Sequence, residues 1–303
     1  MTLDTLQVLW EGCDGSTWDL LDPFSPVRAT NLLGLGLPGF TQQFSEAAAV
    51  DGRVYEGTTW GANTVTMTVL VGDDYVPDGY TERRTGEAWR ALDRSWRASL
   101  SPELTGNLVV ISGVGRRQLE LRLAPEVPTP DGGIQPGHRG KAIYEYTLTA
   151  DDNPWWTGEE QSDFWEFKDE SQPFFGGATG SVLLYISPAS AIQSAAIPNP
   201  GSRPVPPRWW ARGRYASLSV GVGDVMQDLP FPLDQGQEVH VDSATQTITD
   251  ADGNSLWPLM GYADATFPAI PAGELVPVRI ELTGAQPGAG VGVSVRPRFN
   301  GPW

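Results

Sequence analysis

The sequence predicts an all-β protein with one α-helix. We expect an N-terminal β-barrel or β-sandwich domain that carries the helix, followed by a C-terminal β-sandwich domain of the jelly-roll type. Three observations support this fold class. Short segments in which apolar and polar residues alternate recur along the whole chain. Turn residues separate these segments, and the chain holds 35 Gly and 26 Pro. Only one segment has the spacing of an amphipathic helix.

The first half of the chain is predicted to be mostly sheet. Its clearest strand covers residues 64–71, where Met67 and the valines would share one face and the threonines the other. Such alternation is typical of an antiparallel strand with one buried face. Similar patterns predict further strands at residues 6–10, 107–111, 119–123 and 142–148.

A helix is predicted over about residues 85–100. Thr85 is suited to the N-cap position, Glu87 falls in the first turn, and the pair Ser101 and Pro102 would end the helix. The apolar side chains at helical spacing are expected to cover the sheet, and they are Trp89, Leu92, Trp96 and Leu100. The opposite face is expected to contact solvent or another subunit, and it carries Arg90, Asp93, Arg94 and Arg97.

The second half of the chain is predicted to contain short antiparallel strands without a helix between them, which favours a sandwich or jelly roll. A hairpin turn is predicted at Asp252 and Gly253, because Gly tolerates a positive φ. An irregular stretch from residue 151 places the domain boundary, giving domains of residues 1–152 and 153–303. A loop rich in Pro and Gly is expected at residues 125–141 of the first domain. The strands of the second domain are expected at residues 181–186, 216–222, 238–242, 245–249, 276–282 and 291–296.

Charge and cysteine content exclude several classes of function. With 20 Lys and Arg against 37 Asp and Glu, the net charge is −17, which would repel nucleic acids and anionic membranes. Cys13 is the single cysteine, so an intramolecular disulfide and a cysteine-based zinc site are both excluded. The first residues lack the basic and apolar pattern of a signal peptide, and no long apolar run occurs. We therefore expect the chain to fold in a cytoplasm, or to be exported without a signal peptide.

Three short motifs resemble ligand sites but lack the context that such sites need. Residues 34–39 match G-x-G-x-x-G, yet no βαβ unit surrounds them, so a loop between strands is favoured over nucleotide binding. Residues 250–254 resemble the start of a calcium loop, but the Gly and Glu that the rest of such a loop requires are missing. His138 and His240 are the only histidines and belong to no catalytic pattern. We expect no cofactor and no metal.

Residues 159–170 combine acidic and aromatic side chains and are the best enzymatic candidate. Glycoside hydrolysis uses two carboxylates beside a bound sugar, so a glycan-cleaving enzyme is one hypothesis for this stretch. The same composition fits a strand or linker with its acids in solvent and with Trp165 and Phe167 packed. We favour this second interpretation and expect no catalysis.

The chain has 12 tryptophans, which could stack on sugar rings or could anchor cores and protein interfaces. Adjacent residues of a strand face opposite ways, so two neighbouring tryptophans cannot both enter the same core. The ring of each pair that does not enter the core is expected to be able to contact a neighbouring subunit. The pairs are Trp155 with Trp156 and Trp209 with Trp210.

Four local patterns together identify a family that the chain resembles. They are Leu-Trp-Glu-Gly at 9–12, Gly-Ser-Thr-Trp-Asp-Leu at 15–20, Asp-Asn-Pro-Trp-Trp at 152–156, and Asn-Pro-Gly at 199–201 followed by Pro-Val-Pro-Pro-Arg-Trp at 204–209. With the lone helix in a β domain, they resemble the distal tail proteins, or related minor tail proteins, of long-tailed, siphovirus-type bacteriophages. Residues 295–303 resemble the carboxyl ends of such proteins from phages of actinobacteria.

The resemblance implies a structural subunit of the virion tail tip. In that family an N-terminal β domain assembles as a ring, usually a hexamer, under the tail tube, and a C-terminal β-sandwich projects outward. The implied partners are further copies of the chain, the tail tube protein, and the tail-tip, baseplate or fibre proteins. No nucleic-acid or membrane partner is expected. The alternative hypothesis is a carbohydrate-binding module that recognises a host cell-wall polysaccharide.

Two groups of charged residues are expected at interfaces, in addition to the paired tryptophans. A closed ring needs two different patches on each subunit, and the helix face with Arg90, Arg94 and Arg97 is expected to supply part of one. The C-terminal segment is expected to dock onto a neighbouring domain through Arg296, Arg298 and Trp303.

Overall fold

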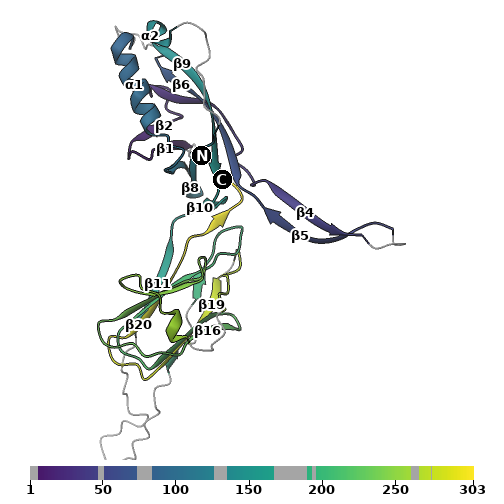
Figure 1. The fold of residues 1–303 in the computed structure, drawn as a ribbon, viewed down its shortest axis with the longest axis vertical. Helices are drawn as coiled ribbons and strands as arrows, with labels where there is room; N and C mark the ends of the chain where they lie inside the picture. Colours follow the sequence, from purple (N-terminus) through teal and green to yellow (C-terminus); the bar gives the residue numbers. More distant parts are fainter. Residues whose placement is uncertain are drawn as a thin grey trace, which may run out of the picture. The chain divides into compact units, whose positions relative to one another are not determined.

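The structure is a computed structural model that describes residues 6–46, 51–73, 84–125, 135–166, 190–192, 196–260, 266–273 and 275–303. The chain divides into two compact units, residues 1–158 with 299–303, and residues 159–298 (Figure 1). This division differs from the expected one, because β10 (Trp156–Thr157) pairs with β8 (Gly115–Leu123) and because the last residues return to the first unit. The strand expected at 181–186 lies outside the described residues.

The N-terminal unit contains an antiparallel sheet in the order β2-β1-β7-β8-β9-β6-β3, to which β10 and β21 add. β8 links its two halves, since it pairs with β7 over residues 115–121 and with β9 at Arg122 and Leu123. The further strands of this sheet are β1 (Gln7–Glu11), β2 (Thr17–Asp19), β3 (Val27–Leu33), β6 (Asn63–Gly72), β7 (Gly106–Ser112), β9 (Lys141–Ala150) and β21 (Arg298–Phe299).

The predicted alternation builds the core of this unit. Along β6, Val65, Met67, Val69 and Val71 are fully buried, as predicted. The expected strands at 6–10, 107–111, 119–123 and 142–148 are confirmed as β1, β7, β8 and β9. The alternation therefore predicts both the strands and their buried faces.

The predicted helix is confirmed as α1 (Gly86–Ala98), with Thr85 at the N-cap position. Both of its tryptophans enter the core. Figure 1 shows α1 beside β6 and β9. The Trp89 indole N–H donates to the carbonyl of Val71 at 3.1 Å, and the Trp96 indole N–H donates to the Tyr146 hydroxyl at 3.1 Å. Within the described residues, the only other helices are the single turns α2 (Pro136–Arg139) and η1 (Trp257–Leu259).

The expectation that Asp93 lies on the solvated face of the helix is wrong. Asp93 is 8% exposed, because it follows Trp89 by one helical turn and precedes Trp96 by another, so all three point inward. The Tyr144 hydroxyl donates to the Asp93 carboxylate at 2.7 Å, and the Arg97 guanidinium lies 3.0 Å from it. These two partners offset the free-energy cost of burying the Asp93 carboxylate.

A separate hairpin interrupts the N-terminal unit. β4 (Phe40–Ser45) pairs with β5 (Val54–Trp60), and in the described part of the chain these strands pair with nothing else. Figure 1 shows them as a two-stranded ribbon. Sequence reasoning did not predict this hairpin.

The C-terminal unit is a β-sandwich, as predicted. One sheet has the order β11-β20-β14-β17-β18, and the other the order β12-β19-β15-β16 with β13 added to β19. Apolar side chains from both sheets form one core, among them Trp209, Val241, Val293, Val220 and Ile280. The strands are β11 (Gln161–Glu166), β12 (Ser190–Ile192), β13 (Ala196–Pro198), β14 (Arg208–Arg212), β15 (Ser217–Val222), β16 (Val225–Leu229), β17 (Glu238–Asp242), β18 (Thr247–Asp250), β19 (Leu275–Thr283) and β20 (Gly290–Val295).

Replacing Tyr144 by Phe is expected to lower the free energy of unfolding of the N-terminal unit by about 1–3 kcal/mol, because the buried Asp93 carboxylate loses a donor. Chemical denaturation followed by tryptophan fluorescence measures this change. Tyr55→Phe is the matched control, since it removes a hydroxyl from the exposed hairpin, with an expected change below about 0.5 kcal/mol. Equal losses in the two variants would contradict the prediction.

Alkaline pH is expected to destabilise the N-terminal unit. Burial raises the pKa of Tyr144 from 10.0 to about 12, and the hydrogen bond to Asp93 adds to this rise. Because the folded state holds the phenol proton more tightly than the unfolded chain, this stabilisation is complete below about pH 10 and disappears as the pH approaches 12. The melting temperature should fall over this range, and fall less steeply in Tyr144→Phe. A flat profile in the native protein would refute this account.

Candidate functional site

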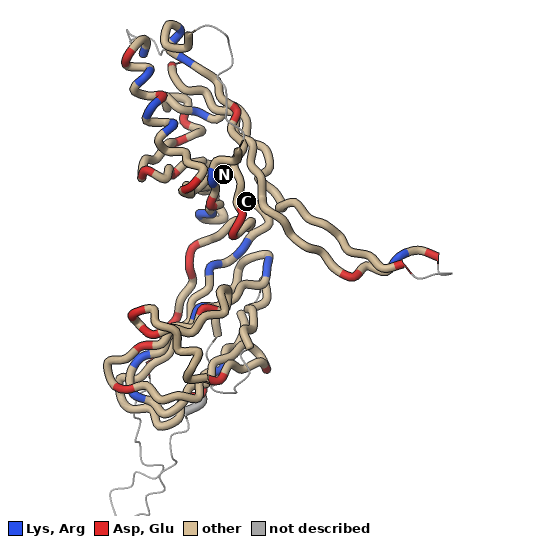
Figure 2. The backbone as a smooth tube through the Cα atoms, in the orientation of Figure 1, with Lys and Arg blue, Asp and Glu red and all other residues tan. Residues whose placement is uncertain are grey.

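The arginines predicted on the helix face pair with two different carboxylates. Arg94 and Arg90 contact Glu87 at 2.6 and 3.4 Å, and in that order they lower the pKa of the Glu87 carboxyl. Arg97 instead belongs to the network of Asp93, and its guanidinium also donates to the Tyr144 hydroxyl at 2.8 Å. Figure 2 shows acidic and basic residues together along α1. All three arginine side chains remain more than half exposed, so each of them can also contact another molecule.

Trp155 and Trp156 are both covered within the N-terminal unit. Trp156 is fully buried in the core, and its indole N–H donates to the Leu35 carbonyl at 2.9 Å. Trp155 lies outside that core cluster, yet it is 8% exposed and packs on Trp60 at a centroid distance of 5.0 Å. The subunit by itself therefore presents neither ring to solvent.

Trp209 and Trp210 face opposite ways, as the alternation predicts. Trp209 enters the core of the C-terminal unit, whereas Trp210 lies partly buried on the outer face of β14. There its ring lies 6.5 Å from that of Phe164, with the planes 13° apart. The outer face of this sheet therefore carries aromatic surface.

The last residues of the chain pack in the N-terminal unit. Arg117 lies over the ring of Phe299 at 3.8 Å and donates to the Gly301 carbonyl at 2.9 Å. Trp303 is 65% exposed. In the C-terminal unit, Arg296 lies 3.5 Å from Glu160, and burial lowers the pKa of the Arg298 guanidinium. Phe299 and Gly301 therefore make the contacts with Arg117, and docking through Arg296, Arg298 and Trp303 stays a prediction.

The β4–β5 hairpin carries an aromatic face that sequence reasoning missed. The cross-strand register brings Phe40 opposite Trp60 and Phe44 opposite Tyr55, with ring centroids 5.3 and 5.9 Å apart. Phe40 and Tyr55 are 54% and 56% exposed. The opposite face carries polar residues such as Thr41. The even spacing of Phe40 and Phe44, which places both on one face of a strand, was the available signal.

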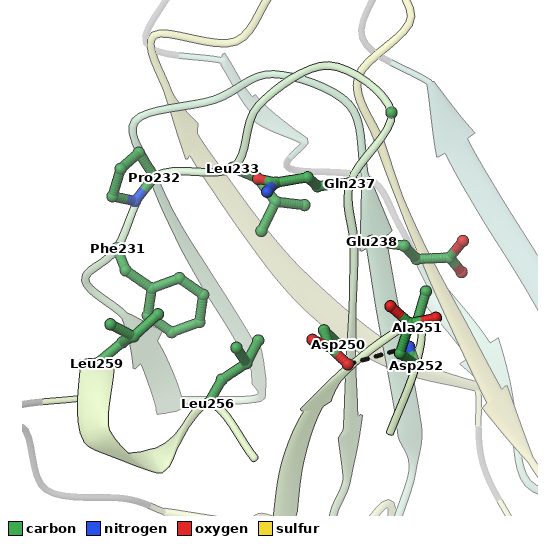
Figure 3. Close-up of a pocket in the computed structure, with 11 residues that line it drawn as sticks. Phe231, Pro232, Leu233, Gln237, Glu238, Asp250, Ala251, Asp252, Leu256 and Leu259 are labelled. Carbon is green, nitrogen blue, oxygen red and sulfur yellow. Dashed lines mark hydrogen bonds between the residues drawn. The ribbon is translucent and has the colours of Figure 1, made fainter. Parts of the chain in front are cut away.

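The pocket in Figure 3 lies between the 231–238 loop, the end of β18 and η1, and has a volume of about 340 Å³. Leucines and Phe231 lie on one side of it, and three acidic residues, Glu238, Asp250 and Asp252, lie on the other. The Asp250 carboxylate accepts hydrogen bonds from Asn254 and from the backbone N–H of Asp252, which lower its pKa. This carboxylate holds the turn around Gly253 (φ +84°), as predicted.

The remaining sequence motifs occupy structural positions. Residues 34–39 form a loop between β3 and β4, as predicted, and His138 lies on the single turn α2. In the described ranges, no group of three or more His, Cys, Asp or Glu side chains could hold a metal ion. None of the described helices is long and apolar enough to cross a membrane. Residues 126–134 of the expected loop and 167–170 of the acidic stretch lie outside the described residues, and Trp165 of that stretch packs against the core of the C-terminal unit.

Comparison with protein-family models gives no match, and comparison with curated protein sequences gives none either. Among solved structures, the fold is shared with proteins of phage adsorption hubs and baseplates. One of them is the Dit protein (gp 19.1) of phage SPP1, described as a paradigm of the hub adsorption apparatus in phages that infect Gram-positive bacteria. Its TM-score is 0.62 at 12% identity, over 97% of this chain and 99% of that chain. A chain of the phage p2 baseplate in its activated conformation with Sr gives a TM-score of 0.51 at 14% identity, over 96% of this chain and 98% of that chain.

Deleting residues 299–303 is expected to lower the melting temperature of the N-terminal unit by about 4 °C or more, because Arg117 loses both its aromatic and its carbonyl partner. Deleting Trp303 alone is the matched control, since its exposed ring should leave the melting temperature unchanged. Differential scanning calorimetry compares the two. If the longer deletion behaves like the shorter one, the segment does not stabilise the unit.

Proposed function

We propose that the chain is a structural, non-catalytic subunit of a phage tail tip, which assembles with copies of itself into a ring between the tail tube and the tip proteins. The observation that carries this proposal is the fold shared with SPP1 Dit over 97% of this chain and 99% of that chain. Such coverage leaves no large part of either chain without a counterpart. The sequence patterns at 9–20, 152–156 and 199–209 support the same assignment.

The aromatic face of the β4–β5 hairpin is the surface best suited to a second copy of the chain. Its rings pack on one another across the two strands but are still more than half exposed at Phe40 and Tyr55. A two-stranded ribbon has only one layer, so it can bury this face only against something else. Exposed aromatic side chains of this kind are typical of protein interfaces.

A closed ring needs a second, different patch that accepts the first one. We assign this patch to the exposed side of α1, where Glu87, Arg90 and Arg94 offer charges of both signs. Arginine packs well on aromatic rings, so Arg90 and Arg94 match the aromatic face of the hairpin chemically. Arg53 over the Phe44 ring, at 3.6 Å, shows this type of contact within the hairpin itself.

The other partners follow from the proposed position in the virion. The ring would contact the tail tube protein on one side and baseplate, tail-tip or fibre proteins on the other. The subunit would fold in the host cytoplasm before assembly at the tail tip. The resemblance of residues 295–303 to the ends of actinophage proteins supports an actinobacterial host.

Self-assembly is tested by light scattering over a range of concentrations, together with negative-stain images. A species near six times 32.7 kDa, or ring-shaped particles, is expected. In Tyr55→Asp, a charge in the aromatic face should weaken association by about tenfold or more, because an unpaired carboxylate would be buried. The melting temperature should stay unchanged, since Tyr55 contributes to no core.

Thr41→Asp is the matched control, because it places the same charge on the polar face of the same hairpin. Its assembly should remain within about twofold of the native protein. A native protein that stays monomeric at every concentration would contradict ring formation. Native-like assembly of Tyr55→Asp would remove the hairpin from the interface and leave ring formation standing.

A further inference from the structure

The outer face of the β11-β20-β14-β17-β18 sheet has an ordered arrangement of side chains. One cross-strand row places Phe164, Gly292, Trp210, His240 and Thr249 side by side. The neighbouring row, two residues along each strand, consists of Ser162, Ser294, Arg208, Asp242 and Thr247. An aromatic row therefore lies directly beside a polar and charged one.

Glycines in β20 allow the two rings to lie over the sheet. A Cβ atom at Gly292 would come within 2.1 Å of the Trp210 ring, and one at Gly290 within 2.4 Å of the Phe164 ring. The rings therefore occupy the space that side chains of β20 would fill, with their planes 13° apart. Arg212 lies over the Phe164 ring at 4.6 Å. Trp210 is the ring of this pair that lines the adjoining groove.

The groove beside Trp210 is open and has a volume of about 570 Å³. Its polar lining is already arranged in pairs: Arg208 donates to Asp242 at 2.8 Å, and His240 lies 3.4 Å from Glu238. The rest of the polar lining consists of the threonines of β18, Ser294 and Glu160. The groove thus combines one aromatic ring with fixed donors and acceptors.

This lining discriminates between classes of ligand. The groove is lined by one arginine and by more than one carboxylate. This excess of negative charge disfavours phosphates and nucleic acids. A single ring among polar groups is too little apolar surface for a lipid. β14, which carries Trp210, pairs on both sides, with β20 and with β17, so a peptide cannot add a strand beside Trp210.

A neutral sugar fits both the aromatic ring and the polar groups of the groove. One face of a pyranose ring presents C–H groups that pack on an aromatic ring, and its hydroxyls both donate and accept hydrogen bonds. Charged side chains make the stronger bonds to such hydroxyls. We propose that this groove is a binding site for a neutral saccharide, which stacks on Trp210 and is held through its hydroxyls by Arg208, Asp242 and Glu238.

The test uses the full chain on an array of immobilised oligosaccharides that includes neutral hexoses, N-acetylhexosamines, deoxyhexoses and pentoses, with anionic glycans alongside. Calorimetry with the strongest ligand follows. Binding to at least one neutral class is expected, with a dissociation constant of about 1 mM or below. Trp210→Ala should weaken it by about tenfold or more, because truncation of a central tryptophan removes a large share of binding energy.

Trp257→Ala is the matched control, since Trp257 belongs to the same unit, is 38% exposed and does not line the groove. The affinity of this control for the saccharide should remain within about twofold of that of the native protein.

Arg208→Met changes an exposed side chain, so this variant tests saccharide binding even if Trp210→Ala fails to fold. The affinity of Arg208→Met for the saccharide should also fall clearly. Absence of neutral-glycan binding, binding of anionic glycans alone, or binding that survives both Trp210→Ala and Arg208→Met would overturn the proposal. Ring assembly is measured separately, so the two proposals stand or fall independently.

Discussion

The structure depends on the alternation of side chains along antiparallel strands, because each strand can give only one of its faces to a given core. In the N-terminal unit, this constraint places the buried side chains of β6 and β9 under α1. Trp89 and Trp96 of the helix complete the core. The helix can pack there only if Asp93, on the same side as the two tryptophans, finds partners. Tyr144 and Arg97 supply them, so one buried polar network determines how the helix meets the sheet.

The same constraint explains where the chain can meet other molecules. Residues that do not face a core must face solvent or a partner, and in the described part of the chain they include the aromatic residues of two surfaces. On the β4–β5 hairpin, no second layer of described residues covers Phe40 and Tyr55, and both stay exposed. On the C-terminal unit, Trp210 lies over Gly292 next to a polar row. The first surface is flat and aromatic, as suits a protein partner, and the second is a groove with paired charges, as suits a polar small ligand.

Much of the fold could be predicted because period-two alternation and helical spacing are local patterns. The strand at 64–71, the helix near 85–100 and the strand at 238–242 were found in this way. The β4–β5 hairpin was missed because three polar residues separate Phe40 from Phe44, so the segment shows no strict alternation. β10 and β14 were missed because their adjacent tryptophans break the alternation. The candidate surfaces were predicted only in part: the paired tryptophans drew attention to Trp210, whereas nothing in the local pattern indicated the neighbouring row with Arg208 and Asp242.

The sequence by itself determined the all-β class, the single long helix, the absence of an intramolecular disulfide and the inward faces of the main strands. Each of these follows from composition or from residues close together in the chain. Only the tertiary structure decided the burial of Asp93, the covering of Trp155 by Trp60 and the return of Phe299 to Arg117. These depend on cross-strand register and on contacts between distant segments. A one-residue change of register would reverse every outward side chain, and local propensity does not determine the register.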